Sequence, residues 1–402
     1  MRVLVFNCGS SSLKFELLEV SAAGQLIDRL ARGTFAEIGP RAHATMSASD
    51  GRKLDAPTAV ANHAQAALHA IEWLRAGTGI TQLDAIAHRI VHGGDRVSEP
   101  VIVDDGVLNA LDEASRFAPL HNPPAIATLR AVRDQFPSVP SIVVADTAFH
   151  RTLPPVARTY AIPRELAARH GIHRFGFHGI GHSWMLDRYA EISGRPAATL
   201  NLITLQLGAG CSAAAICAGR SIDTSMGLTP LEGLMMATRS GDLDPAIFSY
   251  LATSDRLSPT EVERILNHDS GLRGVSGLSD DMRELEAAAA GNTDAALAID
   301  IFCYRIRKYI GAYMTVLGRV DAIVFGAGIG EHSANVRARV CRGLEPFGVI
   351  LDEARNAAAN GHEACFSADQ SRCALWVVPL DEELQIARSA ARLLAVGVRV
   401  TN

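Results

Sequence analysis

Apolar residues near the start of the chain form two strand-like patterns on either side of a short polar segment. Residues 3–6 are a continuous apolar run, and between 13 and 17 every second residue is apolar, which is the period of a half-buried strand. The segment Asn7-Cys8-Gly9-Ser10-Ser11-Ser12 between them is rich in turn residues. Its N–H groups and hydroxyls suit a phosphate, and Lys14 adds a positive charge, but these residues equally fit a plain hairpin.

The same pattern returns halfway along the chain. Residues 199–207 are an apolar strand, 208–212 a turn of small residues, and 213–217 a second apolar strand. Repetition of a strand–turn–strand unit indicates an internal duplication. We therefore expect two halves whose turns face each other across one interdomain cleft.

The remaining periodicity predicts an α/β protein. Helical spacing of apolar residues marks helices at 61–77, 107–116, 183–193 and 294–318, and short apolar runs mark strands at 85–87, 141–147, 322–325 and 375–379. The last helix is expected from 380, and a serine N-cap at Ser279 is expected before a shorter helix. After the strand at 322–325 comes a glycine turn, Gly326 to Glu331, and then a helical pattern. Strand, glycine turn and helix is a nucleotide-binding arrangement, although Gly-x-Gly-x-x-Gly is not matched.

Candidate chemistry gathers where predicted strands end. Arg89 follows a buried strand and precedes two glycines; it is either a site residue or a structural partner of a carboxylate. Asp146 ends another strand, where it either holds a metal or a substrate hydroxyl or caps the next element. His121 lies in a proline-rich turn as a site residue or a capping side chain, and Arg239 lies in a polar loop. Glu382 lies in the first turn of the last helix, where it is either a site residue or an acid that interacts favourably with the helix dipole.

His178 and His182 are four residues apart, which could suit zinc on a helix. The pattern that supports such a site is His-Glu-x-x-His, and it is absent here. We therefore favour a loop histidine that faces a ligand.

Composition narrows the function classes. The 402 residues suggest two or three domains, and a net charge of −5 argues against bulk nucleic-acid binding. No run of 18 apolar residues exists, so no membrane-spanning helix is expected, and because an apolar strand pattern begins at residue 3 no signal peptide is expected either. The seven cysteines form no Cys-x-x-Cys pair, which suits a reducing cytosol. We expect a cytoplasmic enzyme.

Phosphate-type turns, loop arginines, a histidine and strand-end carboxylates together fit phosphoryl transfer. With these motifs the chain resembles the acetate kinase (acetokinase) family of the actin-like and sugar-kinase superfamily, over nearly its whole length. The motifs that carry the resemblance are Asn7 to Lys14, His88 to Gly94, Ala118 to Pro124, Asp146 to His150, Gly176 to Gly179, Thr224 to Arg239 and Gly326 to Glu331.

The resemblance implies a duplicated actin-like or ribonuclease H-like α/β fold with two domains, 1–148 plus 385–402 and 149–384, and usually a homodimer. It implies transfer of a phosphoryl group from ATP to acetate with Mg²⁺, or alternatively Mn²⁺, to give acetyl phosphate and ADP. Acetate is ionised at neutral pH, so this reaction needs charge cancellation and no general base.

By the same resemblance, Asp146, His178, Arg239 and Arg89 are catalytic. Asn7, Asp146 and Glu382 hold the metal. Arg89, Val91, Leu120, His121, Phe177 and Pro230 bind the carboxylate and its methyl group. The nucleotide is bound by Ser10, Ser12, Lys14, Gln206, Gly208, Gly210, Asp281, Met282, Arg283, Gly326, Ala327, Gly328, Ile329 and Gly330.

The chain departs from the family on the phosphate-donor side. The second turn has Gln206 where the family has histidine, Ala209 for asparagine and Cys211 for serine, and Gly179-Ile180-Gly181-His182 replaces Gly-Thr-Ser-His. His332 and Cys8 are also unusual. Loss of one positioned donor typically lowers a rate by ~10²–10³. The sequence thus leaves three alternatives: propionate or butyrate as substrate, pyrophosphate as donor, or a weakened paralogue that only binds nucleotide or acyl phosphate.

Overall fold

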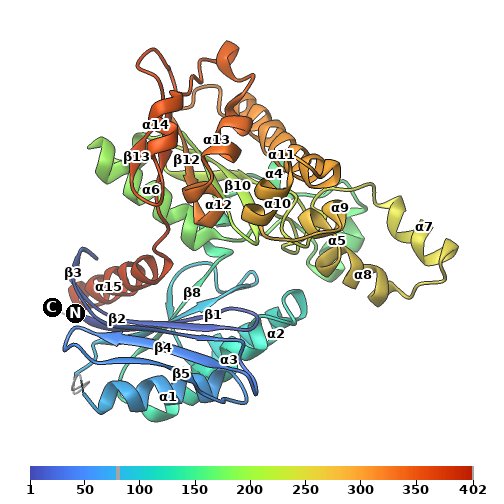
Figure 1. Ribbon diagram of the computed structural model, residues 1–402. Coiled ribbons are helices and arrows are strands. Elements are labelled where there is room, and N and C mark those ends of the chain that lie inside the picture. Colours follow the sequence, from blue (N-terminus) through green and yellow to red (C-terminus); the bar gives the residue numbers. More distant parts are fainter. Residues whose placement is uncertain (78–81, 401–402) are drawn as a thin grey trace. The chain divides into compact units, whose positions relative to one another are not determined.

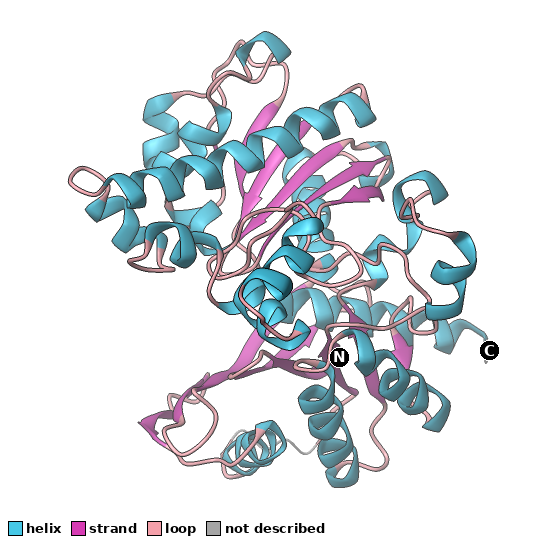
Figure 2. Cartoon of the chain, turned by 90° about the vertical axis from the view of Figure 1, so that its right-hand side faces the viewer, coloured by secondary structure: helices cyan, strands magenta, loops and turns pink. Residues whose placement is uncertain are grey.

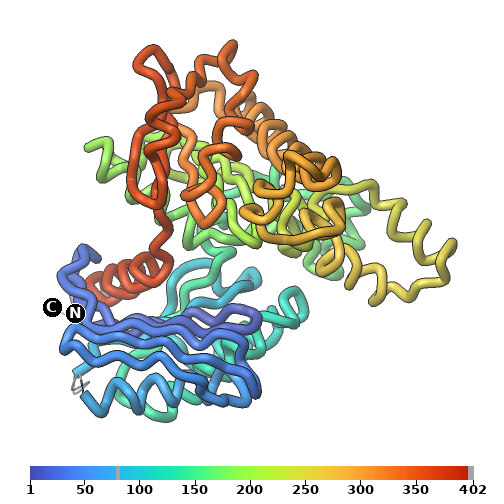
Figure 3. The backbone as a smooth tube through the Cα atoms, in the orientation of Figure 1, coloured from blue at the N-terminus to red at the C-terminus, as the bar shows by residue number. Residues whose placement is uncertain are grey.

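The computed structural model describes residues 1–77 and 82–400. The described chain divides into two compact units: unit 1 contains residues 1–149 and the segment from 381 onward, and unit 2 contains residues 150–380. The domain boundaries expected from the sequence, after 148 and 384, stay a prediction, and residues 401–402 of the first expected domain lie outside the described part. In Figure 3 the last segment of the chain, in red, lies beside the first strands, in blue.

Unit 1 is built on a mixed sheet that contains eight strands within the described residues, in the order β5-β4-β3-β2-β1-β6-β8-β7. The strands β1 to β5 form an antiparallel meander, while β1, β6 and β8 are parallel neighbours. The strands are β1 (Arg2–Cys8), β2 (Leu13–Val20), β3 (Leu26–Ala36), β4 (His43–Ala48), β5 (Lys53–Pro57), β6 (Ala85–Ile90), β7 (Val101–Ile102) and β8 (Ser141–Ala145).

The helices of unit 1 cover both faces of this sheet (Figure 1). The last helix packs on β1, β2 and β6, and α1 and α3 pack against each other and against the strands from the other side. Pro123 and Pro124 occupy the first turn of α3, as the sequence predicted, because proline needs no hydrogen bond there. The helices are α1 (His63–Arg75), α2 (Asp105–Ala114), α3 (Asn122–Gln135) and α15 (Glu382–Val400).

Unit 2 is built on a sheet that contains six strands in its described residues, in the order β11-β10-β9-β12-β14-β13. The strands β9 and β10 form an antiparallel hairpin, and β9, β12 and β14 are parallel. The magenta strands of Figure 2 form these two sheets. The strands are β9 (Leu202–Leu207), β10 (Cys211–Cys217), β11 (Arg220–Thr224), β12 (Ala322–Gly326), β13 (Ala364–Cys365) and β14 (Ala374–Val377).

The helices of unit 2 include two that lie directly on the sheet: α6 on β9 and β12, and the long α11 on β10 and β9. Of the other helices, α9, α10 and α13 contact α11, whereas α7 and α8 contact each other and project away from the sheet of unit 2 (Figure 1). The helices are α4 (Pro155–Arg158), α5 (Arg164–His170), α6 (Gly179–Ser193), α7 (Ala246–Ser254), α8 (Pro259–His268), α9 (Gly271–Ser276), α10 (Met282–Ala288), α11 (Thr293–Leu317), α12 (Ala327–His332), α13 (Ala334–Cys341) and α14 (Glu353–Ala358).

The two units share one topology, which confirms the predicted duplication. In unit 1 the series β3-β2-β1-β6-β8 has an antiparallel hairpin joined to two parallel strands, and in unit 2 β11-β10-β9-β12-β14 has the same pattern. The predicted turns connect β1 to β2 and β9 to β10. Each therefore lies at the end of the central strand of its sheet.

Three local predictions were wrong. The helix expected from 183 begins at Gly179. The glycine turn expected at 326–331 is instead mostly helical: Gly326 is the N-cap residue, and α12 begins at the next residue. The N-cap of α10 is Asp281, whose side chain accepts from the backbone of Arg283 (2.8 Å), and not Ser279. Short-range hydrogen bonds of this kind move helix ends by a few residues without altering the fold.

Candidate functional site

The first group of candidate residues lies at the carboxyl ends of parallel strands in unit 1. Asn7 is near the end of β1, Arg89 is near the end of β6, and Asp146 follows β8 directly. Because Phe6 pairs with His88 and Arg89 with Val144, the register brings all three side chains to one edge of the sheet.

Arg89 is the centre of this group. It donates from Nε and Nη2 to Oδ2 of Asp146, at 3.2 and 2.7 Å, and from Nη1 to Oδ1 of Asn7, at 2.9 Å. The amide of Asn7 in turn donates to Glu382 (3.2 Å) and Glu383 (2.9 Å) at the start of α15. The pairing of Arg89 with a carboxylate, which the sequence left as an alternative, is therefore present.

Burial governs the charges here. The Asp146 side chain is 1% exposed, and burial raises the pKa of its carboxyl group although Arg89 opposes that shift. Burial alone would lower the pKa of Arg89, yet Asp146 and Glu382 raise it, so the guanidinium stays charged. A buried cation between carboxylates is a site where a change in net charge is costly.

The donor types at this edge fit magnesium. Asn7, Asp146 and Glu382 offer an amide oxygen and two carboxylates, which are the hard oxygen ligands that Mg²⁺ prefers. Among residues 1–77 and 82–400, no group of three His, Cys, Asp or Glu side chains is placed to enclose a metal. Mg²⁺ commonly binds through one or two carboxylates and keeps several waters, so this set suits it.

The second group lies in unit 2 around the turn between β9 and β10. The position that a Cβ atom would take on Gly210 is 3.2 Å from Cε1 and Nε2 of His178 and 3.7 Å from Nη1 of Arg239. The histidine and the arginine therefore converge on this turn. His178 adopts a left-handed conformation (φ 58°), which is unusual for a residue with a side chain and is found where surrounding contacts enforce it.

Arg239 differs from Arg89 in its partners. Its Nη1 donates to the carbonyl of Pro230 (3.1 Å) and approaches the sulfur of Met236 (3.6 Å), and in the described part of the chain it forms no ion pair. Burial lowers its pKa. A partly buried guanidinium without a carboxylate partner is suited to bind an anion.

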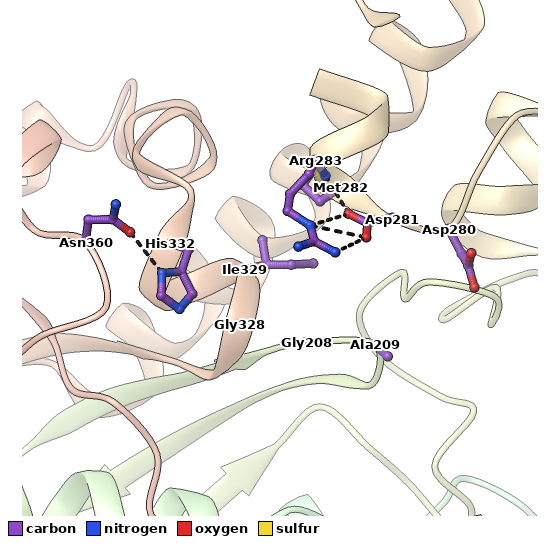
Figure 4. A pocket seen from close by; sticks show the side chains of 10 residues that line it. All are labelled: Gly208, Ala209, Asp280, Asp281, Met282, Arg283, Gly328, Ile329, His332 and Asn360. Carbon is purple, nitrogen blue, oxygen red and sulfur yellow. Dashed lines mark hydrogen bonds and ion pairs between the residues drawn. The ribbon is translucent and has the colours of Figure 1, made fainter. Parts of the chain in front are cut away.

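A cavity of about 670 Å³ lies in unit 2 (Figure 4). Figure 4 shows Arg283 folded back on Asp281, and the Nδ1 of His332 lies 2.9 Å from Oδ1 of Asn360. The hydrogen bonds from Arg283 lower the pKa of Asp281 to about 2. The lining residues are Gly208, Ala209, Asp280, Asp281, Met282, Arg283, Gly328, Ile329, His332 and Asn360.

Six residues predicted to bind nucleotide line this cavity: Gly208, Asp281, Met282, Arg283, Gly328 and Ile329. Four of its lining residues were not among the predicted site residues: Ala209, Asp280, His332 and Asn360. Asn360-Gly361 signals only a turn in the sequence, and nothing local connects it to residue 332.

Other predicted nucleotide residues lie elsewhere. Gly326 has Met185, Leu380 and Val378 around the place of its missing Cβ, at 3.0–3.1 Å, so packing alone requires glycine there. The roles of the remaining residues stay predictions: Gln206, Gly210, Ala327 and Gly330 in unit 2, and Ser10, Ser12 and Lys14 in or beside the first turn of unit 1.

The predicted carboxylate residues are divided between the units. Val91 and Phe177 are buried, whereas Leu120 is 62% exposed. His121 precedes α3 but makes no capping hydrogen bond, so the capping alternative is wrong. Pro230 contributes its carbonyl to Arg239. The apolar pocket predicted from these residues stays a prediction.

Comparison with known proteins identifies the family. The model described as the acetokinase family matches residues 2–388. The chain belongs to the acetokinase family.

The similarity to members of the acetokinase family extends over almost the whole chain. The sequence is 45% identical to the acetate kinase of Solibacter usitatus (strain Ellin6076) over 98% of each chain. The structure of Porphyromonas gingivalis acetate kinase matches with a TM-score of 0.90 at 37% identity, covering 98% of this chain and 99% of that one. The structure of a propionate kinase from Francisella tularensis subsp. tularensis SCHU S4 matches with a TM-score of 0.89 at 36% sequence identity, covering 96% of this chain and 98% of that one. These matches confirm the predicted duplicated actin-like fold.

Two of the departures from the acetokinase motifs are inert thiols. Burial raises the pKa of Cys8 to about 11 and that of Cys211 to about 12, so both stay protonated. Cys211 donates to the carbonyl of Gly208 at 3.1 Å and closes the turn. The thiol at 211 therefore joins the two ends of this turn.

Two further departures from the acetokinase motifs belong together. A Cβ atom on Gly181 would lie 2.0 Å from Oε1 of Gln206, so the Gln206 carboxamide occupies the space that a side chain at 181 would need. Gln206 and Gly181 are thus matched in shape, across the contact between β9 and α6.

Proposed function

We propose that this chain catalyses the reversible transfer of a phosphoryl group from ATP to acetate, giving acetyl phosphate and ADP. Membership of the acetokinase family supports the reaction class. The structural observation that supports it most directly is Arg239, a partly buried guanidinium without an ion-pair partner in the described residues, beside His178 and the turn at Gly210.

Each residue group has a part in this proposal. Arg239 and His178 bind the oxygens of the transferring phosphoryl group and stabilise the charge on it. Arg89 neutralises the carboxylate, and the cavity lined by Met282 and Ile329 takes the adenosine. Acetate is already ionised at neutral pH, so no residue has to remove a proton from it.

The proposal includes Mg²⁺ bound by Asn7, Asp146 and Glu382, directly or through water. When bound, the ion would withdraw charge from the phosphate oxygens. Removal of divalent cations with EDTA should abolish turnover, and Mg²⁺ or Mn²⁺ should restore it. Full activity in EDTA would contradict this part of the proposal.

Propionate is the second candidate substrate, because the solved propionate kinase from Francisella tularensis is nearly as similar as the acetate kinase from Porphyromonas gingivalis. One extra methylene changes binding in an apolar pocket by only about 1–3 kcal/mol. Relative kcat/KM for acetate, propionate and butyrate decides between them.

We further propose a cytoplasmic homodimer, from the family resemblance. None of the helices in residues 1–77 and 82–400 has the length and apolarity needed to cross a bilayer.

The decisive assay measures acyl phosphate formed from each acid with ATP and with pyrophosphate as donor. We expect acetyl phosphate from acetate and ATP. Absence of product with every short carboxylate and both donors would refute the proposal and leave a binding-only protein.

A further inference from the structure

A series of hydrogen bonds runs from the partly buried His178 into the interior of unit 2. The Nδ1 of His178 lies 2.9 Å from the hydroxyl of Ser212, which lies 2.8 Å from Nε2 of His182. On the other side of that ring, Nδ1 lies 2.7 Å from the hydroxyl of Thr204. The last three residues are fully buried.

The fold explains why these four residues meet. In the β9–β10 hairpin Ser212 pairs with Gln206 and Thr204 with Ala214, so Thr204 and Ser212 lie on the same face of the sheet. Helix α6 packs on β9, His182 lies in its first turn and His178 is its N-cap residue, and both rings reach the hydroxyl of Ser212. Two histidines with this spacing could have suited zinc, which the sequence did not favour, and here both bind one serine hydroxyl.

The number of available protons decides which group donates in each of these hydrogen bonds. In one direction the Thr204 hydroxyl donates to Nδ1 of His182, Nε2–H of His182 donates to Ser212, and Ser212 donates to Nδ1 of His178. Every buried donor then has an acceptor. In the other direction His182 donates to Thr204, and the Thr204 O–H has no other hydrogen-bond partner among the described residues.

The free-energy difference between the two hydrogen-bonding directions follows from the cost of one unpaired donor. A buried donor without an acceptor costs about 1–3 kcal/mol, which corresponds to a ratio on the order of 5–150 in favour of the first direction. Burial lowers the pKa of His182 well below its usual value, so this ring is neutral and able to donate and accept at once.

We propose that Thr204, His182 and Ser212 are positioning residues that hold His178 as the neutral tautomer with its proton on Nε2. The catalytic use of this tautomer rests on the proposed phosphoryl transfer. The Nε2 edge lies 3.2 Å from the Cβ position of Gly210, beside Arg239. An N–H donor is therefore aimed at the turn where the phosphoryl group is expected, with no need for a charged ring.

The tautomer can be observed directly by ¹⁵N NMR of the full chain labelled at its 14 histidines. The His178 signals are assigned by their loss in His178→Gln. We expect a protonated Nε2 and an unprotonated Nδ1 for His178 at pH 7–8. A protonated Nδ1, or a doubly protonated ring, in the parent protein would overturn the proposal.

Thr204→Val tests the origin of the bias. Without the Thr204 hydroxyl, neither hydrogen-bonding direction is favoured, so the ¹⁵N shifts of His178 should move toward those of a tautomer mixture. We expect kcat to fall only about twofold, because about half of the molecules keep the productive tautomer. Thr204→Ser should restore the parent shifts. Unchanged His178 shifts in Thr204→Val would show that Thr204 does not set the tautomer.

Thr128→Val is the matched control. It removes a buried threonine hydroxyl in α3 of unit 1, which donates to the carbonyl of Pro124 at 2.9 Å, so it should lower stability without moving the His178 signals. Ser212→Ala removes the link to the ring itself. We expect its kcat to fall by about tenfold or more, with KM for acetate unchanged, as part of the ~10²–10³ that a positioned donor contributes. A rise in KM with kcat intact would contradict a role in the transition state.

The NMR measurement needs no substrate. If acyl phosphate is not formed but the tautomer is as expected, the proposed function fails and the hydrogen-bond chain stands. If acyl phosphate is formed and the tautomer is wrong, only this inference fails.

Discussion

The contact between Gly181 and Gln206 makes a prediction that only this pair of residues can test. The Gln206 side chain is 7% exposed, and its Oε1 lies 2.0 Å from the place of a Cβ atom on residue 181. Gly181→Ala would therefore force the carboxamide to move. Gln206→Ala removes the carboxamide and leaves the space open.

The size of the effect follows from the geometry. Carbon and its neighbours normally stay about 3.5 Å or more apart, so the carboxamide must retreat by about 1.5 Å in a closely packed interior. Such overpacking costs about 1–3 kcal/mol, whereas replacing a helical glycine by alanine returns up to about 1 kcal/mol. We expect Gly181→Ala to lower the free energy of unfolding by about 1–2 kcal/mol in the parent protein.

The assay is urea unfolding of the parent, both single variants and the double variant. In the Gln206→Ala background, Gly181→Ala should be neutral or stabilising, because the overlap is gone while the gain in helix propensity remains. The coupling energy should be about 1–3 kcal/mol. Additive effects, with a coupling below about 0.5 kcal/mol, would refute the claim that these two positions are matched.

Three other changes test the site and its surroundings. Arg89→Met leaves Asp146 as an unpaired buried carboxylate and should cost about 3–5 kcal/mol of stability, and adding Asp146→Asn should recover part of it; urea unfolding that shows no recovery would contradict the ion pair. Gln206→His returns the charge-bearing side chain typical of the family and should raise kcat with ATP, so an unchanged or lower kcat would argue against our interpretation of the second turn. Glu16 lies in β2, and burial raises the pKa of its carboxyl group from 4.5 to about 7. The contribution of this group to the free energy of unfolding is therefore fully present below about pH 4.5 and is lost as the pH rises through about 7. The free energy of unfolding of the parent should accordingly fall relative to Glu16→Gln between pH 5 and 8, by on the order of 2–3 kcal/mol, and a constant difference would contradict this.

The sequence by itself determined the two strand–turn–strand units, their repetition, and the parallel strands β6, β8, β12 and β14. Period-two alternation and glycine turns are local properties, so the strand–turn–strand units at both places were predictable. Family motifs gave the candidate residues and the duplicated fold. The helix starts at Gly179 and at Ala327 were missed, because neither helix has a capping side chain that the sequence could have signalled.

Only the tertiary structure decided which residues depend on one another. Strand register and the packing of α6 on the sheet bring Thr204, Ser212 and the two histidines into one hydrogen-bonded chain, although they lie up to 34 positions apart. The same packing places Gln206 against Gly181 and makes two separate departures from the family one matched pair. Distance along the chain carries no record of such contacts, because they arise when side chains from different elements share one buried space.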